Sequence, residues 1–75
     1  MIKIHLSRIL GERRITQKKL FEMTGISQNS ISKIYNEKVK GIDFDTIEKI
    51  CTALDIEIKD LLEIVPGTRS EEDYD

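Results

Sequence analysis

The sequence predicts an all-α fold, a compact domain of five short helices preceded by one short β-strand. Apolar residues recur every three or four positions through most of the chain, which is the spacing of one face of a helix. The chain has 75 residues, enough for one domain with one modest core. We expect this domain to span residues 1–66. Residues 67–75 are charged and lack apolar periodicity, so we expect a disordered acidic tail there.

The first five residues alternate apolar and polar side chains and include β-branched Ile2 and Ile4, which predicts a short strand. A single strand cannot stand alone, so it pairs either with residues 62–65 or with the same strand of a second copy. We favour the pairing within the chain, because Pro66 would end a short strand and because the termini of a small domain often lie close together.

Residues 6–14 predict the first helix, and residues 44–54 the clearest amphipathic helix, with Asp43 as its N-cap. Residues 57–63 predict a fifth short helix or turn. Gly11 in the first helix is unfavourable by up to about 1 kcal/mol relative to alanine, and the close approach of another helix would be one benefit of it. The residues expected to face inward are Leu6, Ile9, Leu10, Phe44, Ile47, Ile50, Cys51, Leu54, Ile58, Leu61 and Leu62.

Residues 16–38 predict two short helices joined by a tight turn at residues 24–27. Thr16 and Ser27 carry hydroxyls where an N-cap would accept a hydrogen bond from a free backbone N–H group. Gly25 lies just past the first of these helices, where the chain often needs the left-handed conformation that glycine adopts without steric strain. The pattern indicates a helix-turn-helix.

Charge is divided unevenly along the chain. The net charge of −2 argues against a nucleic-acid binder. However, residues 13–40 carry a local balance of +5, residues 41–75 carry −8 and residues 1–12 carry +1. An anionic partner would respond to the local balance around the helix pair, not to the average over the chain.

The helix after Ser27, residues 28–37, turns Ile31 and Ile34 toward the core and a polar face outward. Such a face is most often simply solvated, but this one is rich in amides and has no acidic residue from 28 to 36. Amide, amine and hydroxyl side chains are the groups that contact base edges in the major groove. The side chains on this face are Gln28, Asn29, Ser32, Lys33 and Asn36, with Ser30 at its boundary. Those expected at the flanks, where phosphates pass, are Gln17, Asn36, Lys38 and Lys40.

The segments TQKKL, TGIS, QNSISKIYNEK, DFDTIEKICTALDI and IKDLL resemble the phage-repressor-like (Cro and lambda-repressor class) helix-turn-helix family over residues 6–64. The resemblance implies a lambda-repressor-like domain that binds double-stranded DNA sequence-specifically and regulates transcription, most often as a homodimer in bacteria or their mobile elements. It implies base-facing positions at Gln28, Asn29, Ser32 and Lys33. It implies phosphate-contacting positions at Gln17 and Asn36, and we expect Ser30, Lys38 and Lys40 to contact phosphates as well.

Two departures from the family bear on packing and assembly. Position 21 is usually a small alanine where the two motif helices cross, and here it is Phe21, which either swings outward or changes the packing angle. The chain also lacks the long C-terminal dimerisation region of full repressors. We therefore do not assume the usual dimer interface.

Other functional classes have little support in the sequence. With one histidine, His5, and one cysteine, Cys51, we expect no disulfide, no metal, no cofactor and no enzymatic activity. There is no signal peptide and no apolar stretch long enough for a membrane span, so we expect a cytoplasmic protein. The alternative to DNA regulation is a protein-interaction module on the same fold, such as an antitoxin-like or anti-repressor partner.

Overall fold

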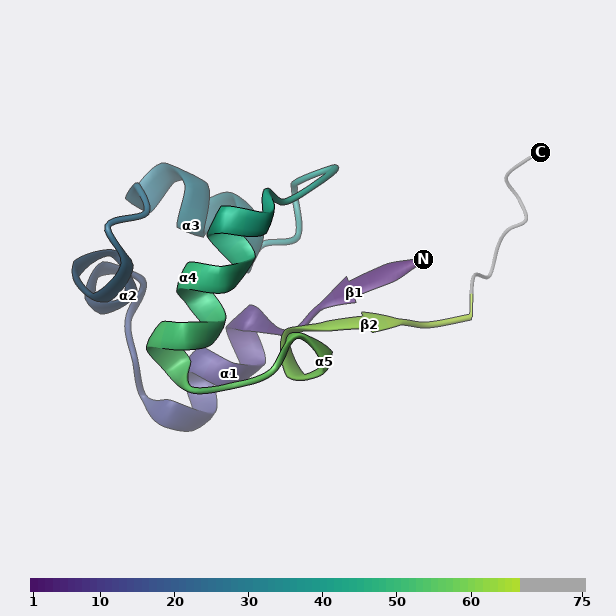
Figure 1. Cartoon of the computed structure of the whole chain (residues 1–75), viewed down its shortest axis with the longest axis horizontal. Helices are drawn as coiled ribbons and strands as arrows, with labels where there is room; N and C mark the ends of the chain where they lie inside the picture. Colours follow the sequence, from purple (N-terminus) through teal and green to yellow (C-terminus); the bar gives the residue numbers. More distant parts are fainter. Residues whose placement is uncertain (67–75) are drawn as a thin grey trace.

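The computed structural model describes residues 1–66, a body of five helices from which a two-stranded ribbon projects (Figure 1). The predicted acidic tail, 67–75, lies outside the described residues. The predicted fold class is confirmed. Within residues 1–66, no helix has both the length and the apolar character needed to cross a membrane. The elements in chain order are β1 (Ile2–Ile4), α1 (Leu6–Arg13), α2 (Gln17–Thr24), α3 (Gln28–Tyr35), α4 (Phe44–Leu54), α5 (Ile58–Leu61) and β2 (Leu62–Ile64).

The strands β1 and β2 pair antiparallel within the chain, as favoured from the sequence. Ile2 lies opposite Ile64 and Ile4 opposite Leu62, so one face of the ribbon is entirely apolar. The ribbon extends from the helical body on the side away from α2 (Figure 1). Its outer end is closed by two hydrogen bonds between Met1 and Val65, 3.0 and 2.9 Å long.

A single apolar core joins all five helices to the base of the ribbon. Its fully buried side chains are Leu6, Leu10, Leu20, Ile31, Ile50, Leu54 and Leu61. Cys51 is a buried core thiol, and burial, helped by the Asp60 carboxylate, raises its pKa. The close approach of another helix does not explain Gly11. A Cβ atom at this position would meet nothing within 4 Å.

Two predictions of inward-facing residues are wrong. Phe44 is 90% exposed and Ile58 is 60% exposed. Each is the first residue of its helix, so it lies at the end of the apolar stripe, where no other element in residues 1–66 covers it. The fifth segment also divides: α5 ends at Leu61 because Leu62 turns to an extended backbone (φ −122°, ψ 142°) and begins β2.

Candidate nucleic-acid interface

The helices α2 and α3 begin and end as the sequence predicts. Thr16 Oγ1 accepts a hydrogen bond from the Lys19 N–H at 3.0 Å, and Ser27 Oγ accepts one from the Ser30 N–H at 3.2 Å. These bonds satisfy backbone donors that a helix N-terminus leaves free. Gly25 has φ 77°, and its N–H donates to the Phe21 carbonyl at 2.8 Å. Both N-caps and the glycine C-cap are confirmed.

The turn between the two helices is fixed by its own hydrogen bonds and by burial. Thr24 Oγ1 donates to the Leu20 carbonyl at 2.7 Å and accepts from the Ile26 N–H at 3.1 Å. Ile26 is buried, and Leu20 of α2 and Ile31 of α3 are both fully buried. A turn held in this way orients α3 against α2 as one rigid unit.

The four residues predicted to contact bases do not have equal access to solvent. Gln28, Asn29 and Lys33 are exposed on α3. Ser32 is half-buried, and its hydroxyl lies 3.4 Å from the Nδ2 atom of Asn36. The first turn of α3 carries no acidic residue. The exposed face therefore offers amides and an amine in the first two turns of the helix.

The predicted phosphate-contacting residues lie at the two ends of this face. Gln17 is half-buried at the start of α2, and Ser30 is exposed with its hydroxyl accepting from Ser27 Oγ at 3.0 Å. Lys38 and Lys40 are exposed on the loop that follows α3. Asn36 instead turns back on its helix, where its amide donates to the Ser32 carbonyl at 2.9 Å. The backbone N–H of Asn36 donates to the same carbonyl at 3.0 Å, so the side-chain amide is a second donor there, a contact that the sequence did not indicate.

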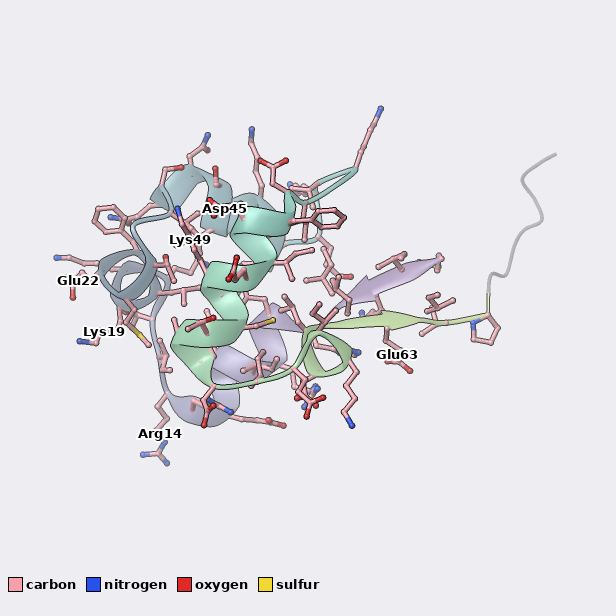
Figure 2. All side chains as sticks on the ribbon, viewed as in Figure 1. Arg14, Lys19, Glu22, Asp45, Lys49 and Glu63 are labelled. Atoms are coloured by element: carbon pink, nitrogen blue, oxygen red, sulfur yellow. The ribbon has the colours of Figure 1, made fainter. Side chains whose placement is uncertain are left out.

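The basic residues of segment 13–40 do not form one continuous surface. Arg13 is exposed at the end of α1, and its guanidinium donates to the Leu54 carbonyl at the end of α4. Figure 2 shows Arg14 at the end of α1, on the opposite side of the molecule from α3, and Lys19 pointing outward from α2. Lys33 on α3 and Lys38 and Lys40 on the following loop carry positive charge beside this face, and Lys18 is also exposed on α2.

Glu37 was missed as a positioning residue, and no local pattern in the sequence indicates its role. It follows α3 with a left-handed backbone (φ 57°). Its carboxylate accepts from the Ile4 N–H at 3.2 Å and from Lys3 Nζ at 3.3 Å. The hydrogen bond from Ile4, followed by that from Lys3, holds the pKa of Glu37 below its usual range. The carboxylate thus ties the end of α3 to strand β1 and is not a free negative charge beside the lysines.

Phe21, the departure from the family pattern, is 37% exposed on α2. The exposure fits the outward alternative, in which the ring avoids the crossing of α2 and α3. The crossing itself is packed by smaller aliphatic groups, Leu20 and Ile31, which have no exposed surface.

Comparison with known proteins agrees with this geometry. The family described as the Cro/C1-type HTH DNA-binding domain matches residues 5–67. The uncharacterized HTH-type transcriptional regulator YozG of Bacillus subtilis (strain 168) is 36% identical over 72 residues, which cover 96% of this chain and 81% of the relative. The resemblance to phage repressors seen in the sequence is confirmed. The chain belongs to the Cro/C1-type helix-turn-helix DNA-binding family.

Proposed function

We propose that this protein is a sequence-specific transcriptional regulator that places α3 in the DNA major groove and acts as a homodimer. The observation that carries the proposal is the exposed face of α3, where Gln28, Asn29 and Lys33 stand free of internal partners among the described hydrogen bonds and ion pairs. Amides pair with adenine and lysine with guanine in the major groove. We also propose that the protein is not an enzyme and that it acts in the cytoplasm.

The roles divide between base contacts and phosphate contacts. Gln28, Asn29, Ser32 and Lys33 are the base-contacting set, of which Ser32 has the least access. Lys38 and Lys40 lie on the following loop and supply charge to phosphates, while Gln17 and Ser30 supply neutral hydrogen bonds. Asn36 reaches a phosphate only by giving up its bond to the Ser32 carbonyl. One module makes few base contacts, so a pair on half-sites about one helical turn apart supplies the specificity.

The test begins by selecting bound duplexes from a random pool, and a palindromic consensus is the expected result. Fluorescence anisotropy then compares variants on the selected duplex and on random duplexes. Gln28→Ala and Lys33→Ala should reduce the preference for the selected duplex, by about 1–3 kcal/mol for each lost base contact. Lys40→Ala should weaken binding to both duplexes alike and lower the salt dependence.

Lys19→Ala is the matched control, because it removes the same charge from a side chain that points away from α3 (Figure 2). It should change neither affinity nor preference. Equal losses on both duplexes for Gln28→Ala, Lys33→Ala and Lys40→Ala would refute the divided roles. Failure to select any sequence, together with a stable protein complex that survives high salt, would favour the antitoxin-like or anti-repressor alternative.

A further inference from the structure

An apolar face lies next to the helix-turn-helix, and no described part of the chain covers it. It runs from the first turn of α4, across the start of α5, to the outer half of the ribbon. Four of its side chains are more than half exposed: Phe44 at 90%, Ile64 at 81%, Ile58 at 60% and Ile2 at 58%. Isolated exposed apolar residues need no explanation, but a contiguous group of large ones indicates an interaction site.

The continuity of the face follows from two shallow hollows that share a border. One is lined in part by Ile2, Ile4 and Val39, and the other by Phe44, Cys51 and Ile58. Both hollows are also lined by Ile47 and Leu62. Ile64 continues the same face of the ribbon, because it lies directly opposite Ile2 in the antiparallel register. We define the apolar face by Ile2, Phe44, Ile47, Ile58, Leu62 and Ile64.

We infer that the apolar face is the docking surface for a second copy of this chain. This inference rests on the proposed function, since the second copy is the one that occupies the second half-site. A two-fold contact places each central residue beside its own copy in the partner, so a charged centre would repel itself. The six residues that define the face are all uncharged. The centre of such a face can therefore meet itself without placing like charges together, and the charged residues that line the hollows are Lys40 in one and Glu48 and Glu57 in the other.

The size of the face also suits a second copy. Its four most exposed side chains carry on the order of 500 Å² of apolar surface per copy. A pair would bury about 1,000 Å² from these side chains alone, which reaches the lower limit for a specific protein interface before the surrounding backbone and rim are included.

The position of the face leaves the DNA-contacting helix free. Neither hollow is lined by a residue of α3. The ribbon projects on the side away from α2 (Figure 1), and its strand β1 meets only the C-terminal end of α3, through Glu37. Two copies joined at this face would therefore leave the proposed base-contacting side chains Gln28, Asn29 and Lys33 uncovered, whereas Lys40 lies at the border of the hollow beside the ribbon.

Sedimentation equilibrium of the wild type and of Phe44→Glu tests the inference. Phe44 contributes almost nothing to the core, and a carboxylate in the first turn of α4 is favourable for that helix, so the variant should fold. We expect the wild type at twice its 8.7 kDa monomer mass and Phe44→Glu at the monomer mass, at protein concentrations up to about 1 mM. Met23→Glu is the matched control, a charge placed at an exposed apolar residue of α2, and should remain dimeric.

DNA binding separates a failure of this inference from a failure of the proposed function. On a single half-site, Phe44→Glu should bind as the wild type does. On a duplex with two half-sites, the affinity of Phe44→Glu should be about 100-fold or more lower than that of the wild type, because the variant lacks the contact between copies. A wild type that stays monomeric, or a Phe44→Glu variant that dimerises normally, overturns the docking surface whatever the DNA result. If neither protein prefers any DNA sequence, the proposed function is overturned. The sedimentation masses then still show whether the apolar face joins two copies.

Discussion

Removing the Glu37 carboxylate should destabilise the domain by releasing α3 from β1. The change Glu37→Ala deletes the acceptor of the Ile4 N–H and the partner of Lys3. A buried hydrogen bond to a charged group contributes about 1.5–3 kcal/mol. The side chains of Glu37 and Lys3 are 35% and 48% exposed, so solvent screening reduces the expected loss in the free energy of unfolding to about 1–2 kcal/mol.

The assay is urea unfolding followed by circular dichroism, with Glu37→Gly as the matched variant. Both variants lose the same hydrogen bonds, but glycine also relieves the left-handed backbone at this position, where φ is 57°. Glycine should therefore be more stable than alanine here, by up to about 1 kcal/mol. A Glu37→Ala variant with the wild-type urea midpoint and slope would refute the argument.

The same carboxylate should make the free energy of unfolding fall at low pH. The pKa of Glu37 is lowered from 4.5 in the folded state, so the unfolded state binds the proton more tightly. The contribution of this carboxylate is fully present above pH 4.5 and is lost as the pH falls through the folded pKa. The free energy of unfolding of Glu37→Gln should therefore fall less on acidification than that of the wild type. The same pH dependence in the variant and the wild type would contradict the assignment.

Two glycine substitutions should change stability in opposite directions. Gly11→Ala should raise the free energy of unfolding by about 0.5–1 kcal/mol in urea unfolding, because the helix has open space for the added methyl and alanine is the better helix former. Gly25→Ala should lower it by about 1–2 kcal/mol, because φ is +77° and the added Cβ strains a left-handed residue although it meets no neighbour within 4 Å. A destabilised Gly11→Ala would show that this position has a role beyond helix propensity, and an unchanged Gly25→Ala would show that the turn relaxes.

The features that could be predicted from the sequence are those fixed within a few residues. The caps at Thr16 and Ser27 need only a hydroxyl placed three residues before a backbone N–H. The stop at Gly25 follows from one left-handed residue at a helix end. These local rules placed α2, the turn and α3, and with them the exposed face that carries the proposed base contacts.

The features that were missed depend on which distant segments meet. Periodicity puts Phe44 on the inward stripe of α4, but burial requires another element to cover that turn, and no described element does. Arg13 is exposed on its helix, and its guanidinium also reaches the Leu54 carbonyl, 41 residues further along the chain. Glu37 likewise finds Ile4 across 33 residues. A single sequence carries no signal for such pairs.

In the proposed homodimer, Glu37 and the apolar face would together make the distance between the two α3 helices a property of the fold. The Glu37 carboxylate joins the end of α3 to Ile4 of β1, and Ile2, two residues along the same strand, belongs to the apolar face. The path from the end of the helix to the proposed docking surface is therefore three residues of strand and one part-buried hydrogen bond. A contact at the apolar face would fix the spacing of two α3 helices through this short path.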